Sequence, residues 1–454
     1  MVDRPILYLI AGLQLLFLIS LKMFALISLK KNVQQQILAR SIYVLSALLV
    51  NVAIASFTNA AATGMLLYAS AIFALIVLIG GMSLESALGY YYAGEKLGAK
   101  HAITMALFQI IVLLMVLLMV QLLFPTFFAR LTNGFNTGLY LFVSGTLLTN
   151  FFLATLYAGK QYLKPNLVQA ILNVLLVFIL WVEYRKNFAI AILFKTYFYF
   201  IFLNGVVVLL VFMQQVKWKT ENGSMHSSFK QVYQYAMKAL WANVLFFIVY
   251  RLDYWFVHQY TTANDAGNYI QAARLAQMFI LLPQFIAPVI FNTTANGGAT
   301  QQMNEWLAAF MKFFFLMFSI LFIVVAAGGQ FIFTHLFGSS FNNIHKVLLL
   351  FIPGLFFLSC LNLLSAYFGG MNRVRINIVG AALAAVTTIA GNILIIPFYT
   401  IFWAALVSTL SYIVAALWAL YQYKKMPPSL SIDLFSLKKS DCRFIQALFH
   451  SKSE

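Results

Sequence analysis

Long runs of apolar residues, separated by short polar stretches, dominate the chain from residue 38 onward. A helix needs about 20 residues to cross about 30 Å of hydrocarbon. Because lipid offers no hydrogen bonds to the backbone, and the alternation typical of a membrane barrel is missing, these runs are expected to be α-helices. They predict twelve spans, at 38–58, 64–90, 104–124, 138–158, 166–184, 189–213, 236–258, 268–291, 309–333, 347–368, 377–396 and 401–422.

Composition agrees with this pattern. The chain is 63% hydrophobic and only 9% charged, with a mean hydropathy of +0.89, whereas soluble domains contain about 25% charged residues. Such a chain cannot cover its surface with polar groups, so the sequence predicts an all-α polytopic membrane protein. Two cysteines, Cys360 and Cys442, give no disulfide framework, and Cys360 is expected to be a packing thiol inside an apolar run.

Residues 6–29 are also apolar, but Lys22 divides them. Three interpretations stay open: a thirteenth spanning helix, a helix lying in the membrane interface, or a translation start at Met23. A removed signal peptide is less favoured, because the run lacks a clear small-residue cleavage site. The topology of segment 1–37 is therefore undecided.

The net charge of +18 could indicate binding to nucleic acid or to anionic lipid, but its distribution favours topology as the main cause. With alternate loops placed in the cytoplasm, nineteen basic residues lie on that side, from Lys30 to Lys452. The opposite loops hold four: Arg130, Arg185, Lys186 and Lys346. This asymmetry follows the positive-inside rule and puts the C-terminus in the cytoplasm. No nucleic-acid partner is expected, and the basic tail 423–454 can contact anionic headgroups.

The two halves of the chain share short patterns. Gly64 opens the second predicted span as Gly267 precedes the eighth, and Tyr157 stands before the fifth span as Tyr367 stands before the eleventh. The two spacings differ by only a few residues. We therefore predict two six-helix lobes, 38–213 and 236–422, joined by a polar cytoplasmic linker at 214–235. Parallel repeats around a central cavity suit alternating access.

Charged residues inside predicted spans are the sharpest candidates for a site, because burying a charge in the bilayer costs about 2.5–3.5 kcal/mol on insertion scales. Five such residues are the candidates: Glu85, Lys195, Arg251, Asp253 and Arg274. We predict that Arg251, Arg274 and Lys195 line the cavity and attract an anionic group such as a phosphate. Asp253 is then a counter-ion or the site of a coupling cation.

Structural alternatives accompany each candidate. Asp253 and Arg274 lie at similar depth across one hairpin, so they could form a neutralised pair that only locks two helices. The long side chain of Lys195 could instead extend outward, so that its ammonium group reaches the outer membrane interface. Glu85 lies near the inner end of its span, where an interfacial role is favoured over ion coupling. Arg40 opens the first span, where it is either a topology anchor or a binding residue.

Other chemistry has little support. The six histidines show no metal-ligand spacing and no phosphate-binding GxxxxGK[ST] loop occurs, so we predict no metal, no cofactor and no ATP hydrolysis. Pro283, Pro288 and Pro353 interrupt predicted spans as kinks or hinges.

Around the seventh and eighth spans the chain resembles Wzx-type polysaccharide flippases of the multidrug/oligosaccharidyl-lipid/polysaccharide exporter superfamily. The resemblance rests on Tyr250-Arg251-Leu252-Asp253, on Ala266-Gly267-Asn268-Tyr269 and on Ala273-Arg274-Leu275. Leu29-Lys30-Lys31-Asn32 and Gly391-Asn392-Ile393 through Pro397 are similar too. The likeness covers about residues 29–422 and departs from the family after Pro397, where Tyr399 stands in place of an expected glycine, and in residues 6–29.

This resemblance implies twelve helices in two lobes and a diphosphate-linked oligosaccharide moved outward across the inner membrane, coupled to a cation gradient. Membrane lipids, a glycan polymerase and other polysaccharide assembly proteins are the implied partners. Two alternatives remain. A small-molecule or drug antiporter of the same superfamily is less favoured, since Arg and Lys outnumber Asp in the spans. A membrane polymerase or ligase typically carries a large external loop, which this chain lacks.

Overall fold

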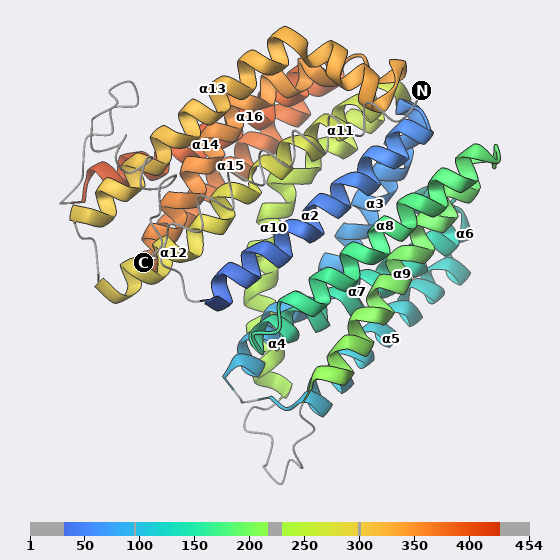
Figure 1. Ribbon diagram of the computed structural model, residues 1–454, viewed down its shortest axis with the longest axis horizontal. Helices are drawn as coiled ribbons and strands as arrows, with labels where there is room; N and C mark the ends of the chain where they lie inside the picture. The colour runs from blue at the N-terminus through green and yellow to red at the C-terminus, as the bar shows by residue number, and fades with distance from the viewer. Residues whose placement is uncertain (1–30, 95–96, 217–228, 298–300, 427–454) are drawn as a thin grey trace. The chain divides into compact units, whose positions relative to one another are not determined.

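Every regular element in the described part of the chain is a helix. The computed structural model describes residues 31–94, 97–216, 229–297 and 301–426. Its α-helices are α2 (Lys31–Phe57), α3 (Ala60–Gly80), α4 (Leu84–Ala93), α5 (Ala99–Leu123), α6 (Pro125–Thr132), α7 (Asn136–Ala158), α8 (Leu163–Arg185), α9 (Ile190–Gln215), α10 (Phe229–Tyr260), α11 (Ala263–Phe279), α12 (Leu281–Gly297), α13 (Gln301–Phe337), α14 (Ile344–Gly370), α15 (Val374–Ile395) and α16 (Ile401–Lys424). Two short 3₁₀ turns, Ser339–Phe341 and Ile396–Phe398, complete it (Figure 1).

Twelve helical segments within the described residues are long and apolar enough to cross a membrane. They correspond one to one with the twelve predicted spans, so the prediction of an all-α polytopic membrane protein is confirmed. The segment 6–29, the middle of the linker and the basic tail lie outside the described residues.

Two predicted spans are not continuous helices. The span 64–90 is divided into α3 and α4, and the backbone between them turns left-handed at Met82 and Ser83, with φ of 53° and 51°. The span 268–291 is divided at Ile280, just before Pro283. Since both interruptions fall in the second spanning segment of a predicted lobe, the division repeats along the chain.

The structure divides into two compact units. Among the described residues, one holds 31–58 and 65–244, and the other holds 59–64 and 245–426. One division therefore falls in the connection between α2 and α3, and two fall inside α3 and α10. Each of these two helices begins in one unit and ends in the other.

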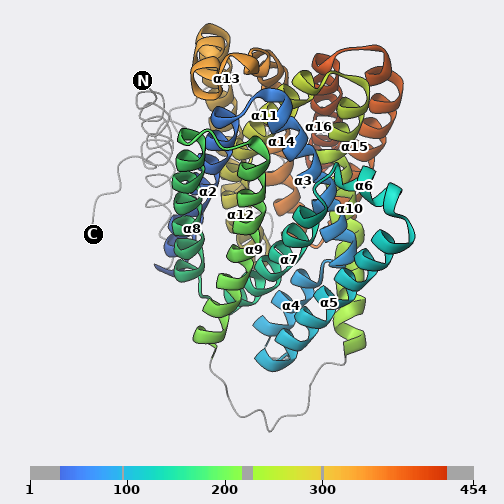
Figure 2. The same cartoon turned by 90° about the vertical axis from the view of Figure 1, so that its right-hand side faces the viewer.

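The same pairs of helices pack together in both units, when each helix is matched to its equivalent in the repeat. In the first unit α7 packs on α9, α4 on α7 and α8 on α9; in the second α14 packs on α16, α12 on α14 and α15 on α16. Figures 1 and 2 both show α14, α15 and α16 as neighbours. These matching pairs are consistent with a six-helix repeat.

Small residues permit the tightest of these contacts. A Cβ atom on Gly145 would lie 2.6 Å from the Cα of Phe202 in α9, and one on Gly354 would lie 2.9 Å from the Cα of Thr409 in α16. Close packing without a Cβ is a common way for helices to associate in a membrane. Gly145 and Gly354 thus fix α7–α9 and α14–α16, the equivalent helix pairs of the two units.

Candidate functional site

A buried carboxylate, Asp253, joins three helices of the second unit. Its Oδ2 accepts hydrogen bonds from the Tyr269 hydroxyl of α11 at 2.5 Å and from the Ser408 hydroxyl of α16 at 3.1 Å. Its Oδ1 accepts one from the backbone N–H of Tyr254 at 3.0 Å. Asp253 is only 3% exposed. Because an unpaired buried charge is costly, these donors are what hold a carboxyl group at this depth.

Arg251 lies two residues before Asp253, about half a turn around α10, and faces different partners. Its Nη2 donates a hydrogen bond to Oε1 of Gln277 at 3.1 Å, and its guanidinium lies over the Tyr254 ring, 5.3 Å from the centroid. Both partners are neutral. The groups in direct contact with the Arg251 guanidinium therefore orient it and carry no charge themselves.

Arg274 belongs to the same cluster. The charges of Arg251, Asp253 and Arg274 all act on the hydroxyl group of Tyr254. The structure thus brings together three of the predicted site residues, from α10 and α11. We call Arg251, Asp253, Arg274, Tyr254, Tyr269, Gln277 and Ser408 the arginine–aspartate cluster.

Hydroxyl groups are the side-chain donors to Asp253: those of Tyr269 and Ser408. The charge of Arg251 also acts on this carboxylate. Arg274 follows Tyr269 by five residues, about 140° around the axis of α11 at 3.6 residues per turn, so the two side chains leave the helix in different directions. The pairing of Asp253 with Arg274 stays a prediction.

The other predicted residues lie in the first unit. Lys195 is exposed on α9 and Arg40 is exposed on α2, where its charge acts on the phenols of Tyr43 and Tyr157. Tyr157 in turn donates to Oδ1 of Asn166 at 2.9 Å. The structure therefore does not place Lys195 or Arg40 in the unit that holds Arg251.

Glu85 lies in the first turn of α4, immediately after the interruption that follows α3. At about 1.5 Å per residue, the 21 residues of α3 already measure about 31 Å, enough to cross the hydrocarbon. Glu85 therefore lies beyond the spanning part of α3. Burial raises the pKa of its carboxyl group, and hydrogen bonding to backbone lowers it by less.

Replacing Glu85 by glutamine is expected to remove a pH dependence of stability. A raised pKa means that the folded protein favours the neutral acid. The contribution of Glu85 to the free energy of unfolding is therefore fully present below the pKa of the unfolded chain, and it is lost as pH rises through the pKa of the folded protein. Thermal unfolding of the purified protein should show this decline, and E85Q should be flatter and more stable at high pH. Equal profiles for both proteins would contradict a raised pKa of the half-buried Glu85 carboxyl group.

Polar side chains from two other helices hold the interruption between α3 and α4. Gln109 of α5 donates to the Gly80 carbonyl at 2.5 Å and accepts from the Tyr233 hydroxyl of α10 at 3.0 Å. Asn243 of α10 donates to the Ser83 hydroxyl at 3.0 Å. These bonds satisfy backbone and side-chain groups that the broken helix leaves open.

Lys312 is a buried basic residue that was not among the candidates predicted from the sequence. Lys312 is 6% exposed in α13. The predicted span began at residue 309 and put Lys312 at its edge. In fact α13 starts at Gln301, because the polar residues before 309 continue the helix. A lysine within an apolar run was the signal that could have found it. Among the described residues no group of three or more His, Cys, Asp or Glu could hold a metal.

Comparison with solved structures defines the class of this fold. The inward closed conformation of the lipid II flippase MurJ aligns with a TM-score of 0.63 and 15% identity, over 86% of this chain and 87% of that one. The Vibrio cholerae MATE transporter VcmN aligns with a TM-score of 0.61 and 12% identity, over 90% and 96%. A MOP superfamily transporter from Pyrococcus furiosus aligns with a TM-score of 0.52 and 14% identity, over 89% and 97%. The chain therefore has the fold of MOP superfamily transporters and flippases.

Comparison of the amino-acid sequence with protein families gives one match. The family described as polysaccharide biosynthesis protein matches residues 160–346, which include Arg251, Asp253 and Arg274. No curated protein matches the chain in sequence. The family match and the transporter fold agree with the resemblance to Wzx-type flippases.

Proposed function

We propose that this protein is a flippase for undecaprenyl-diphosphate-linked oligosaccharide. It moves this lipid from the inner to the outer leaflet of the bacterial cytoplasmic membrane, by alternating access, for export of surface polysaccharide such as O-antigen, lipopolysaccharide or exopolysaccharide. The fold and the polysaccharide family match support the class of cargo. The arginine–aspartate cluster is the observation that carries the proposal.

The chemistry of the cluster fits a diphosphate. Two arginines and one aspartate meet around Tyr254, and Arg251 is oriented by neutral groups. The cluster thus keeps an excess of positive charge within spanning helices. A guanidinium forms paired hydrogen bonds with phosphate oxygens, which favours an anionic lipid head over a cationic drug.

Asp253 is the proposed coupling group. Its carboxylate is buried among hydroxyl donors of α11 and α16, so binding a proton or a cation would lower the cost of its burial. Such binding would alter contacts among three helices at once. This is the type of event that can bias a two-state equilibrium.

The proposed topology follows from the positive-inside pattern: an inner-membrane protein with a cytoplasmic C-terminus. A glycan polymerase and further assembly proteins would act on the translocated lipid. Under the antiporter alternative, the protein would be a small-molecule transporter with the fold that it shares with the MATE structures. It predicts transport of a small cation or metabolite by the same purified protein, whereas the polymerase alternative predicts glycan elongation.

Reconstituted protein tests the function directly. Liposomes are loaded with fluorescent undecaprenyl-diphosphate oligosaccharide prepared from the source bacterium, and the label in the outer leaflet is reduced chemically over time. We expect translocation with the protein and none with D253N under the same ion gradient. Absence of translocation, together with transport of a cationic dye or with glycan elongation, would replace the proposal by one of its alternatives.

A further inference from the structure

The joint between α3 and α4 has a strained backbone. Met82 and Ser83 follow one another in the left-handed region, with φ of 53° and 51°, although neither is glycine. At a residue with a side chain this backbone is disfavoured by about 5- to 30-fold relative to the right-handed one. The sequence contains no proline from residue 60 to residue 93, so the covalent chain does not prevent a continuous helix. Contacts with other helices must therefore hold the broken form.

A side-chain amide replaces one hydrogen bond of the helix at this joint. In a continuous helix the Leu84 N–H would donate to the Gly80 carbonyl, four residues before it. Here the Leu84 N–H donates to the Gly81 carbonyl at 3.0 Å. The Gln109 amide of α5 takes its place at Gly80, at 2.5 Å. Gln109 is only 7% exposed, and its own oxygen accepts from the Tyr233 hydroxyl of α10. The Gly80 carbonyl thus has two candidate donors, one for each form of the helix.

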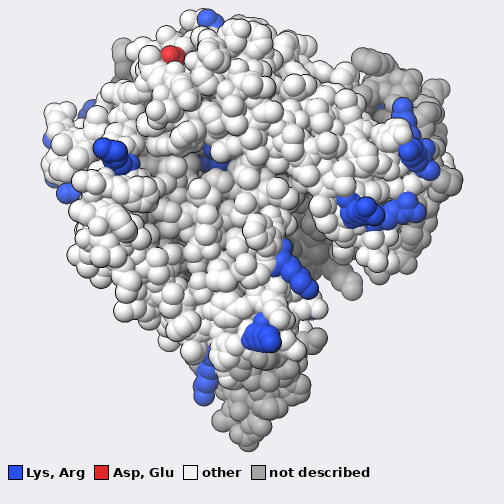
Figure 3. All heavy atoms as spheres, turned by 180° about the vertical axis from the view of Figure 1, so that it is seen from behind, with Lys and Arg blue, Asp and Glu red and all other residues white. Residues whose placement is uncertain are grey.

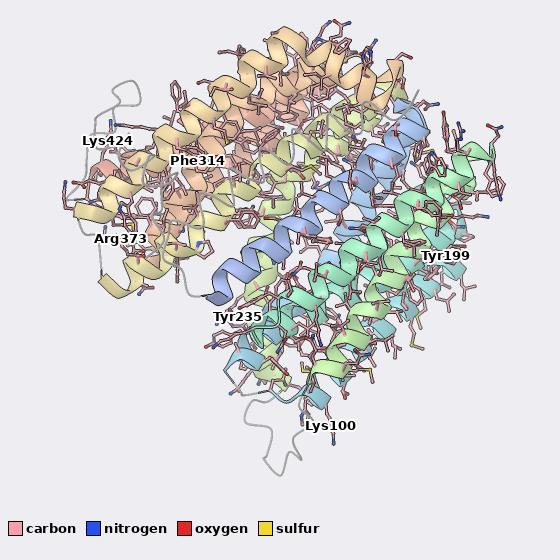
Figure 4. All side chains as sticks on the ribbon, in the orientation of Figure 1. Lys100, Tyr199, Tyr235, Phe314, Arg373 and Lys424 are labelled. Atoms are coloured by element: carbon pink, nitrogen blue, oxygen red, sulfur yellow. The ribbon has the colours of Figure 1, made fainter. Side chains whose placement is uncertain are left out.

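Beyond the joint, the contacts of α4 with α10 lie at the surface. The Tyr91 hydroxyl donates to the Gln231 carbonyl at 3.4 Å. The Tyr90 ring stacks on the Tyr235 ring with centroids 4.8 Å apart, and the two residues are 53% and 37% exposed. Figure 4 shows Tyr235 at the end of this unit where α4 lies. Exposed contacts of this kind exchange for water at little cost, so they permit α4 to move.

The equivalent interruption in the second unit is of a different kind. Ile280, between α11 and α12, keeps a right-handed backbone, with φ of −71° and ψ of −16°. Pro283 follows in the first turn of α12 and has no N–H to donate to the Phe279 carbonyl, so a complete helical hydrogen-bond ladder cannot form there. That break is fixed by the covalent chain. The break between α3 and α4 is held by side chains of other helices.

We infer that the joint between α3 and α4 is a conformational switch, with Gln109 as its latch. When the Gln109 amide leaves the Gly80 carbonyl, the Leu84 N–H donates to that carbonyl and α3 continues into α4 as one helix. Met82 and Ser83 then lose their strained backbone, which offsets the lost bond to Gln109. The switch changes the direction of α4, the end of the second span that the positive-inside pattern assigns to the cytoplasm. It does not depend on the proposed cargo.

Distances between spin labels on α3 and α4 test the switch. M65C and A93C put the labels at two exposed positions, 28 residues apart, in a full-length chain that also carries C360A and C442S. A continuous helix separates the two positions by about 42 Å, at 1.5 Å per residue. The broken form has the separation of these residues in the structure. Because most of the face in Figure 3 carries no charged side chain, the protein is measured in lipid nanodiscs.

Variants on the two sides of the equilibrium should move it in opposite directions. Q109L removes the latch, so the ratio of continuous to broken helix should rise at least about fivefold. M82G relieves the left-handed backbone and should lower this ratio by about 5- to 30-fold. Q121L is the matched control, because Gln121 is also a glutamine of α5 and accepts from the Tyr140 hydroxyl at 2.6 Å, away from the joint. Its distance distribution should equal that of the unmodified chain.

G81A reaches the same end as Q109L by a different route. In the broken form a Cβ on Gly81 would lie 2.6 Å from the Val77 carbonyl oxygen, which is backbone. In a continuous helix alanine is favoured over glycine. The distribution of G81A should therefore also move toward the continuous helix, and it decides the test where Q109L does not fold.

Four outcomes would overturn the inference. A broken-form distribution that persists unchanged in Q109L, or in G81A where only that variant folds, would make the joint a permanent kink. Failure of both variants to fold would show that the continuous helix is not an accessible state. An equal shift in Q121L would show a general loosening of α5, and a shift of M82G toward the continuous helix would contradict the role of strain. Because the readout is a distance within one unit, it stands or falls independently of the flippase assay.

Discussion

Replacing Arg251 by glutamine is expected to slow translocation of lipid-linked oligosaccharide at least about tenfold. A hydrogen bond to a charged group contributes about 1.5–3 kcal/mol, and about 1.4 kcal/mol corresponds to a factor of ten. Glutamine keeps a hydrogen-bonding end for Gln277 but removes the charge and the contact over the Tyr254 ring. R251Q combined with R274Q should abolish activity in the liposome assay and in complementation of a deletion strain.

Arg185 offers a matched control for Arg251. It also lies near an aromatic ring, 6.0 Å from the centroid of Trp181, but it is exposed at the end of α8. R185Q should therefore translocate at the normal rate. Normal translocation by R251Q, with normal protein level, would reduce the arginine to a structural role. R251K separates charge from geometry, because lysine keeps the charge but loses the planar fork.

Much of the architecture could be predicted because the bilayer imposes one length scale. Apolar runs near twenty residues gave all twelve spans. What hydropathy could not predict are the interruptions within them, since Met82 and Ser83 adopt positive φ without being glycine. Hydrogen bonds from Gln109 and Asn243, distant in sequence, stabilise this backbone. The Gly80-Gly81 pair before it was the only local signal.

The candidate site was predictable only in part, for a related reason. The rarity of charge in spans identified Arg251, Asp253 and Arg274, whose burial has a high cost wherever they point. The partners of Asp253 could not be found in this way. Ser408 lies 155 residues further along the chain and is one of many serines in apolar sequence. Direction around a helix axis and packing between distant helices decide such contacts.

Helix α10 connects these features. Its first half, in one unit, is bound through Tyr233 and Asn243 to the side chains that hold the interrupted helix α3–α4. Its second half, in the other unit, carries Arg251 and Asp253. The residue proposed to bind the diphosphate, Arg251, therefore lies on the same helix as the side chains that hold the interruption.

A single added methyl group at Gly267 is expected to impair both stability and translocation. Gly267, in the first turns of α11, packs on the start of α3: a Cβ on Gly64 would lie 2.6 Å from the Gly267 Cα and 2.7 Å from its nitrogen. A Cβ on Gly267 would overlap the Ala60 carbonyl oxygen, which is backbone and cannot turn aside. Overpacking of this kind costs about 1–3 kcal/mol.

The start of α3 belongs to the unit of α11, while the rest of α3 belongs to the other unit. Separation of Gly64 from Gly267 would thus disturb the place where one unit continues into the other, so G267A should lose translocation even where it folds. Thermal unfolding and the liposome assay measure the two effects. Gly328 of α13 is the control, because a Cβ there meets only the Ile332 Cδ1 at 3.6 Å. G328A should translocate normally and be slightly more stable, by up to about 1 kcal/mol. If G267A behaves like G328A, the contact between the two glycines has no part in the transport cycle.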